Sequence, residues 1–273
     1  MRIKIEFKLS GKRQVLPMNY QYPLSAWVYK VLARGDVNFA EFLHEQGFRM
    51  ENQKRFKLFT FSNLQFPTNT FRVIQGTDRM EIFTDKAKLI LAFQIPVTAE
   101  KFVTGLFCDQ RSEIGDRISK IEMEVGTIEV LKLPELTEKI VIRTLSPIVV
   151  SQKTETDKQE QYLKPGDRDY EALFFKNLTD KHNAYNRHIS VEAEDFSTAN
   201  LQFSCLTQSP KSQLQLIKAF TDSPTKVRGY RFDFEITAPP ALIKTGLDSG
   251  FGAMNALGFG CGEILTINNN DKR

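Results

Sequence analysis

His44 is the residue whose type and position best suit acid–base chemistry in this sequence. Within residues 38–46, Phe39, Phe42 and Leu43 recur at the spacing of one helix face, and His44 lies just beyond that face. An imidazole with an ordinary pKa of about 6.5 can exchange a proton at neutral pH. The alternative interpretation is a solvated histidine at the margin of an apolar helix, which is the commoner situation.

Tyr29 and Lys57 could complete a site of this kind. Tyr29 lies one residue beyond its own helical stripe, and Lys57 alternates with Phe56 and Leu58, so it points to the opposite side of a strand. A tyrosine can orient or transfer a proton, and a lysine can stabilise negative charge that develops on a phosphorane. Such a set needs no metal ion. Each residue also has an ordinary structural interpretation, so the chemistry depends on the three side chains converging.

The segment from Gly246 to Ile264 holds six of the chain's 15 glycines. Asn255 stands where a dinucleotide-binding G-x-G-x-x-G motif needs its third glycine, and no Gly-Lys-Ser/Thr follows, so neither familiar phosphate-binding motif is present. Glycine amides can still approach a phosphate closely, because no Cβ keeps it away. The alternative is a glycine-rich turn that links a helix to a strand.

Composition and spacing limit the possible classes of protein. The hydrophobic fraction of 41% and the charged fraction of 26% are typical of a soluble globular protein, and the net charge of +4 is compatible with a nucleic-acid partner. The histidines lack H-x-x-x-H spacing, so we expect no metal site and no cofactor. Cys108, Cys205 and Cys261 form no C-x-x-C pair, and we interpret them as buried free thiols of a cytoplasmic protein. Neither a signal peptide nor a membrane-spanning apolar run is present, so we expect no membrane partner.

The two halves of the chain show the same order of predicted elements. The first half contains an opening strand with Ile3, Ile5 and Phe7, a helix after Pro23, a short helix at 38–46, strands at 55–62, 70–75 and 79–85, a helix at 98–108, and a strand ending near Val130. The second half contains a strand within 138–150, a loop or hairpin at 151–166, a helix with Tyr170, Leu173, Phe174 and Leu178 inside and Arg168, Lys176 and Asp180 outside, extended segments at 190–206, 213–219 and 226–236, a short helix near Pro240, and a strand near 263–267.

This repeated βαββαβ order predicts an α+β fold of two tandem ferredoxin-like (RRM-like) domains. We place the N-terminal domain at residues 1–135 and the C-terminal domain at residues 136–273, with a linker around Leu133 to Lys139.

Several motifs resemble the CRISPR-associated endoribonuclease family that cuts precursor CRISPR RNA within its repeats, part of the repeat-associated mysterious protein superfamily. The resemblance covers nearly the whole chain. The motifs that carry it are "LPMNYQYPLSAWVYKVL", "FLHEQGFR", "FKLFTFS", "IRTLSPIVV" and "GFGAMNALGFG". The last matches the family's glycine-rich loop and is the most specific of them.

The resemblance implies tandem ferredoxin-like domains with a basic cleft, and RNA cleavage without a metal. The ribose 2′-oxygen attacks the adjacent phosphate and leaves a 2′,3′-cyclic phosphate (or the 3′-phosphate it opens to) and a 5′-hydroxyl. Members with a Tyr-His-Lys triad carry it in the first domain, and the matching positions are Tyr29, His44 and Lys57. We expect His44 to act as general base or acid, Tyr29 to orient or share a proton, and Lys57 to stabilise charge. Some relatives lack this histidine and place catalysis elsewhere.

The same resemblance indicates which residues contact RNA. The candidates are Gly250, Gly252, Gly258 and Gly260 through their backbone, Asn255 through its amide, and Lys226, Arg228 and Arg231 as phosphate contacts. For the three basic residues, the alternative is a solvated hairpin. The expected partner is CRISPR repeat RNA, bound by a monomer or homodimer, and other effector-complex subunits remain open as partners. Two alternative functions are a non-catalytic RNA-binding subunit of an interference complex and a binder of small-molecule phosphates.

Overall fold

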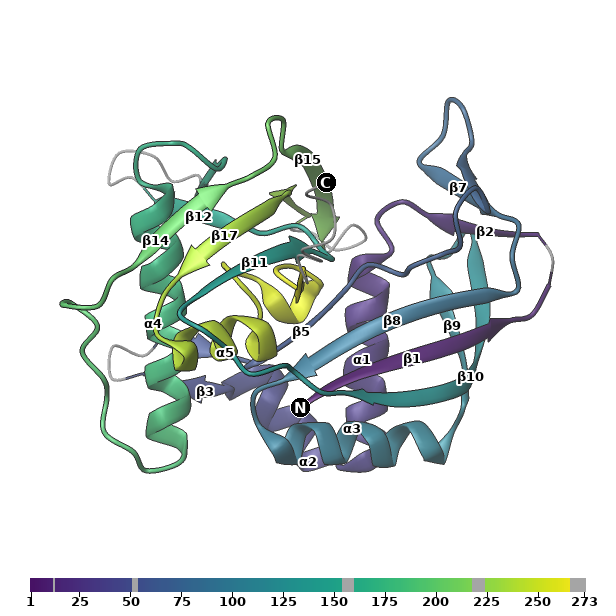
Figure 1. The fold of residues 1–273 in the computed structure, drawn as a ribbon. Coiled ribbons are helices and arrows are strands. Elements are labelled where there is room, and N and C mark those ends of the chain that lie inside the picture. Colours follow the sequence, from purple (N-terminus) through teal and green to yellow (C-terminus); the bar gives the residue numbers. More distant parts are fainter. Residues whose placement is uncertain (12, 51–53, 154–159, 218–223, 266–273) are drawn as a thin grey trace, which may run out of the picture.

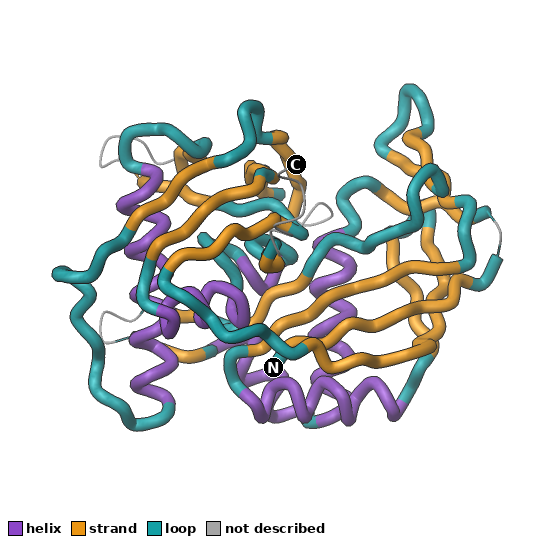
Figure 2. Tube along the Cα trace, viewed as in Figure 1, coloured by secondary structure: helices purple, strands orange, loops and turns teal. Residues whose placement is uncertain are grey.

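Two antiparallel sheets, one in each half of the chain, organise the molecule (Figure 1). The computed structural model describes residues 1–11, 13–50, 54–153, 160–217 and 224–265. Figure 2 shows the two sheets side by side, with the longer helices lying along them. None of the described helices combines the length and the apolar character needed to cross a membrane.

The first sheet is built around the opening strand. Its strands, in order across the sheet, are β5 (Phe59–Phe61), β8 (Lys86–Phe93), β1 (Arg2–Leu9), β10 (Lys120–Leu131) and β9 (Arg111–Gly115). Its helices are α1 (Gln21–Gly35) and α3 (Pro96–Cys108). The indole of Trp27 on α1 contacts both Phe7 of β1 and Phe102 of α3, so the two helices cover the same face. The chain order β1-α1-β5-β8-α3-β10 is that of a ferredoxin-like unit.

The second sheet repeats this arrangement. Its strands are β14 (Gln202–Cys205), β17 (Asp233–Thr237), β11 (Lys139–Thr144) and β18 (Gly262–Ile264), and its helices are α4 (Tyr170–His188) and α5 (Pro240–Ser249). Phe174 of α4 packs edge-on against Phe234 of β17, which closes the core of this half. Both sheets therefore place the first strand between the third and the fourth, and the predicted tandem ferredoxin-like fold is confirmed.

Additional elements interrupt both units. In the first half they are β2 (Gln14–Pro17), α2 (Val37–Glu41), the π-helical turn η1 (Phe42–Gln46), β3 (Phe48–Arg49), β4 (Arg55–Phe56), β6 (Phe71–Val73) and β7 (Arg79–Ile82). In the second half they are the hairpins β12 (Val150–Lys153) with β13 (Glu160–Leu163) and β15 (Lys211–Ile217) with β16 (Thr225–Arg231), and the 3₁₀ turn η2 (Asn255–Leu257). The predicted domain boundary falls in the segment 132–138, between β10 and β11.

Several local expectations differ from the structure. The third strand of the first unit is β8, whereas β7 lies between β2 and β6 in a separate three-stranded sheet. Between 190 and 206 the extended region is confined to β14. Cys108 is exposed and Cys205 half-buried, so of the three thiols Cys261 alone is fully buried as expected. Residues 218–219 and 266–267 of the expected strands lie outside the described residues.

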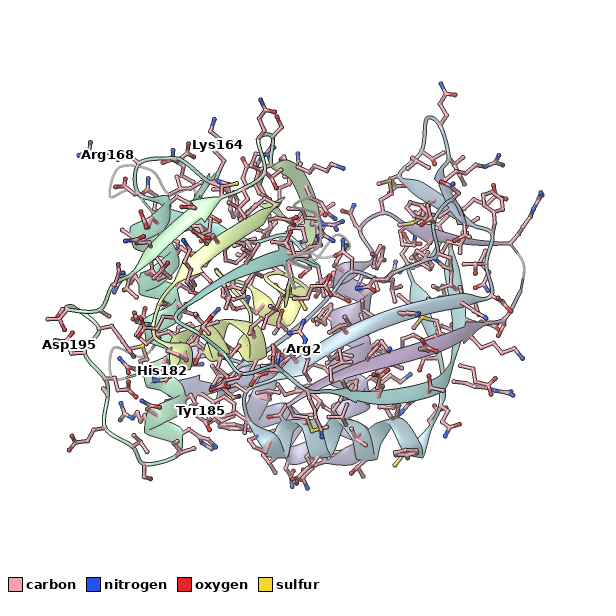
Figure 3. The ribbon with its side chains drawn as sticks, viewed as in Figure 1. Arg2, Lys164, Arg168, His182, Tyr185 and Asp195 are labelled. Carbon is pink, nitrogen blue, oxygen red and sulfur yellow. The ribbon has the colours of Figure 1, made fainter. Side chains whose placement is uncertain are left out.

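Buried polar contacts join the two halves. Arg2 of β1 is 4% exposed and donates to the carbonyls of Leu247 (2.9 Å) and Gly262 in the second half. Figure 3 shows this arginine in the middle of the molecule, between the two sheets. The hydroxyl of Ser25 donates to the Ala256 carbonyl (2.6 Å), and that of Thr60 donates to the Phe259 carbonyl (2.9 Å). These bonds hold the glycine-rich segment against the first unit.

Candidate active site

Tyr29, His44 and Lys57 line one pocket of about 400 Å³, at the boundary between the two halves. The opposite wall comes from the second half. It consists of Asn177 and Lys181 of α4, Ser249 at the end of α5, and residues 253–257. The three side chains therefore come together in one pocket, as the chemistry suggested from the sequence requires. Both ferredoxin-like units contribute to this pocket.

Helix α1 holds Tyr29 at the inner end of the pocket. The neighbouring stripe residues Leu24 and Val28 are fully buried, which fixes the rotation of the helix and leaves Tyr29 at its margin, half-buried. The phenol ring packs edge-on against the His44 imidazole, with 5.1 Å between ring centroids, and against Phe59 at 5.8 Å. Burial raises the pKa of Tyr29 well above its ordinary value. At neutral pH this hydroxyl is a proton donor or hydrogen-bond donor, not a base.

His44 lies on a π-helical turn that ends at a glycine. The Gly47 amide donates to the Phe42 carbonyl (2.8 Å), which adds one residue to the turn and keeps His44 on its exposed side, while Leu43 is buried. Gly47 adopts a φ of +63°, and a Cβ there would lie 2.6 Å from the Phe56 carbonyl oxygen. A glycine is thus required for η1 and β4 to approach each other closely.

Lys57 reaches the pocket from a break between two strands. The sequence predicts one continuous strand here, whereas β4 ends at Phe56, β5 begins at Phe59, and Leu58 adopts a left-handed φ of +53°. Lys57 points away from its buried neighbours Phe56 and Leu58, as expected. The strained backbone at Leu58, and not the alternation of a strand, produces this orientation. The Lys57 ammonium donates to the His44 carbonyl. Burial, and then the nearby Arg55, lower the pKa of Lys57, and Glu45 opposes this effect.

Two further lysines line the pocket and were not singled out from the sequence. Lys54 pairs with Asp180 of α4 at 2.8 Å, so Asp180, expected on the outer side of its helix, is 7% exposed instead. Lys181 is buried and donates to the carbonyls of Gly250 and Gly252 (2.6 Å). Burial lowers the pKa of Lys181 well below its ordinary value, and Lys54 lowers it further. The signal for Lys181 was its spacing of three residues after Leu178, on the apolar stripe of α4.

The glycine-rich segment is packed inside the protein. Gly250, Gly252, Gly258 and Gly260 are all buried with positive φ. The amides of three of them donate to protein carbonyls, namely those of Gly246, Asn255 and Pro147. The Asn255 amide donates to the Phe251 (3.2 Å) and Phe259 (3.0 Å) carbonyls and so fixes the turn. In this structure the segment shapes the pocket wall, which corresponds to the alternative of a glycine-rich turn.

The predicted phosphate contacts of β16 lie outside the pocket. Lys226 and Arg228 are exposed on one face of the strand, and Arg231 is exposed on the other. The Arg228 guanidinium donates to the Ser212 hydroxyl (2.8 Å) on the paired strand β15. Val227, between Lys226 and Arg228, is buried in a small cluster with Phe259 of the glycine-rich segment. The hairpin therefore covers the outer side of the turn that forms the pocket wall.

Comparison with known proteins agrees with this architecture. Residues 15–125 match the family model of the N-terminal part of CRISPR-associated protein Cas6, and residues 131–264 match the model of its C-terminal part. The chain belongs to the Cas6 family. The CRISPR-associated endoribonuclease Cas6 1 of Methanocaldococcus jannaschii is 28% identical over 100% of this chain and 94% of its own length. The Cas6 endoribonuclease of Pyrococcus furiosus is 25% identical over 90% of this chain and 82% of its length.

A solved structure of a Cas6-related protein from Pyrococcus furiosus superposes with a TM-score of 0.78, at 23% identity, over 98% of this chain and 99% of the other. This similarity supports the tandem ferredoxin-like fold assigned from the two sheets. Among the described residues, no group of three or more His, Cys, Asp and Glu side chains is arranged to hold a metal ion. The pocket residues Tyr29, His44 and Lys57 offer a different chemistry, namely proton transfer by the imidazole and the phenol beside a lysine cation.

Proposed function

We propose that this chain is an endoribonuclease that cuts precursor CRISPR RNA within its repeats, without a metal, by attack of a ribose 2′-hydroxyl. The observation that carries the proposal is the single pocket that holds Tyr29, His44 and Lys57 against the glycine-rich segment. Membership of the Cas6 family, whose curated relatives are CRISPR-associated endoribonucleases, supports the substrate class. In this proposal residues 1–135 supply the catalytic side chains, and residues 136–273 supply the opposite wall and the RNA-binding surface.

The reaction forms one bond and breaks one bond at the same phosphorus. The 2′-oxygen bonds to phosphorus and the bond to the 5′-oxygen breaks, which gives a 2′,3′-cyclic phosphate and a 5′-hydroxyl. One proton leaves the 2′-hydroxyl and one is added to the 5′-oxygen, and the His44 imidazole serves as the base or the acid of this exchange. Tyr29 stays protonated near neutral pH and donates a hydrogen bond. Lys57 offsets the negative charge of the phosphorane.

A deoxy substitution in the RNA tests the proposal directly. Purified protein is incubated with repeat RNA in the presence of a chelator, and the ends of the products are identified by mass spectrometry. We expect one cut with a cyclic phosphate or 3′-phosphate and a 5′-hydroxyl. Replacing the nucleotide before the cut by its 2′-deoxy form should abolish cleavage while binding persists. Continued cleavage of the deoxy RNA, or dependence on a divalent ion, would refute the mechanism.

The same experiment separates the two alternative functions. Binding of repeat RNA with no cleavage of any substrate would indicate a non-catalytic RNA-binding subunit. Binding of a small phosphate compound without affinity for RNA would indicate a phosphate-binding protein. The internal hydrogen bonds of the Gly250, Gly258 and Gly260 amides do not favour that last function, because they direct three of the four donors to protein carbonyls.

A further inference from the structure

A second pocket lies beside η1 and β3, where they meet the end of α4. It has a volume of about 560 Å³ and is lined by Phe42, Phe48 and Arg49 from the first half and by Arg187 and His188 from the second. None of these residues was assigned a role from the sequence. Like the first pocket, it is formed where the two ferredoxin-like units meet.

The two pockets share the structural elements between them. On η1, His44 lines the first pocket and Phe42 the second. In the β3–β4 pair, Arg55 and Phe56 line the first, while their register partners Arg49 and Phe48 line the second. On α4, Lys181 lines the first and Arg187 the second, six residues apart, which corresponds to about 9 Å along a helix. The two pockets are therefore neighbours at the junction of the two halves.

Aromatic rings form the floor of the second pocket. Phe48 is 4% exposed and is held edge-on by Phe42, with 5.6 Å between ring centroids. The exposed His188 imidazole contacts the Phe48 ring at 4.7 Å and presents polar atoms beside it. Phe48 is too buried to accept a base itself, so the exposed His188 ring, which rests on Phe48, is the one against which a base of single-stranded RNA can stack.

Two arginines flank these rings. Arg49 and Arg187 are exposed, and neither guanidinium group has a hydrogen-bond or ion-pair partner within the described part of the chain. By contrast, Arg79 and Arg143 bind Asp116 and Asp233, respectively. A cation in the last turn of α4 stabilises the helix end, which by itself explains Arg187. It does not explain Arg49, which reaches the same pocket from β3, and two free guanidinium groups on a concave aromatic surface suit phosphate.

We propose that this second pocket binds one nucleotide of the RNA strand close to the cleaved bond, with its base against the exposed His188 ring and its phosphates on Arg49 and Arg187. The inference rests on the proposed RNA substrate and adds a specific subsite to it. η1, the β3–β4 pair and α4 contribute to both this pocket and the first one, so occupancy of the subsite fixes the register of the strand over His44.

The test uses binding of fluorescent repeat RNA that carries a 2′-deoxy nucleotide at the cleavage site, measured by anisotropy over a range of salt. Arg49→Ala and Arg187→Ala should each weaken binding and each reduce the slope of log K against log salt by about 0.7. Arg111→Ala is the matched control, because Arg111 is exposed on β9, at the far edge of the first sheet. Unchanged affinity and slope in both pocket variants would overturn the inference.

A scan with abasic nucleotides identifies the bound base. One abasic position near the cut should weaken binding to the unaltered protein about fivefold or more, and this penalty should vanish in His188→Ala. A scan in which no position is sensitive, or in which the sensitive position is unaffected by His188→Ala, would overturn the inference.

Cleavage by the unaltered protein separates this inference from the proposed function. Cleavage with unaltered binding in all pocket variants refutes the subsite alone. Specific binding effects without any cleavage retain the subsite and refute the enzyme. A protein that neither binds nor cuts repeat RNA refutes both.

Discussion

The two walls of the candidate active-site pocket are built in opposite ways. The first-half wall carries His44 and Lys57 on irregular backbone, a π-helical turn at His44 and a left-handed residue after Lys57. The second-half wall is a glycine-rich turn whose amides and carbonyls bond to the protein itself, including to the buried Lys181. The first wall presents polar side chains to the pocket, and the second supplies shape. The chemistry and the stability of the site should therefore respond to different mutations.

The largest expected effect is on the first wall. His44→Ala should reduce the cleavage rate by about 10²–10⁴-fold, because proton transfer is lost, while RNA affinity and thermal stability stay close to those of the unaltered protein. Gln46→Ala is the matched control, since Gln46 is exposed on the same turn and does not line the pocket. Single-turnover rates measure both variants. Equal loss in the two variants would mean that the turn, and not the imidazole, is what matters.

Mutations in the second wall should change the stability of the protein. Gly260 adopts a φ of +77°, and a Cβ there would overlap the Phe251 carbonyl oxygen. Gly76 adopts nearly the same φ, +75°, but has no atom within 4 Å of its added Cβ. Gly76→Ala should thus lower the free energy of unfolding by about 1–2 kcal/mol from backbone strain alone. Gly260→Ala should cost about 1–3 kcal/mol more, because of the overlap. Denaturant unfolding of both variants gives this difference, and equal losses would contradict the packed turn.

The pH dependence of cleavage should distinguish the charge of Lys57 from its position in the first wall. The pKa of Lys57 is lowered by burial and by Arg55, so the ammonium loses its proton at a lower pH than an ordinary lysine does. Cleavage should therefore decline on the alkaline side, at a lower pH than the titration of an ordinary lysine would give. Lys57→Arg should move the decline to higher pH, because a guanidinium keeps its charge, even if the maximal rate falls. Cleavage rates measured from neutral to alkaline pH test this prediction. If Lys57→Arg does not shift the alkaline decline, the decline reports the titration of another group.

The sequence predicted the elements with clear periodicity and missed those set by tertiary contacts. The stripe of α1 predicted Tyr29 at the margin of a helix face, and the alternation of β1 predicted the opening strand, as the structure has them. Strand β8 was missed because it is buried between β5 and β1, and its run from Leu89 to Phe93 shows no alternation. Asp180 was placed on the outside of α4 because its partner, Lys54, comes from the other half of the chain.

The same limit applies to the candidate site. Helical spacing alone placed Tyr29 and His44 at the margins of apolar faces, where the structure has them. It could not show that α4 lies against the glycine-rich segment, so the role of Lys181 in holding two carbonyls of that turn was not foreseen. The glycines were noticed, but sequence alone did not distinguish amides directed at a ligand from amides bonded within the turn.

The smallest expected effect concerns the hairpin that covers the second wall. If RNA follows its exposed face, Arg228→Ala should reduce the slope of log K against log salt by about 0.7 and leave the cleavage position unchanged, because a phosphate contact carries no sequence information. Arg231→Ala tests the opposite face of the same strand, and an equal reduction would place the RNA along the strand edge. Salt titrations of RNA binding measure both slopes. An unchanged slope in Arg228→Ala would leave the hairpin with a packing role, through Val227 and Phe259, and would confine RNA contacts to the junction of the two halves.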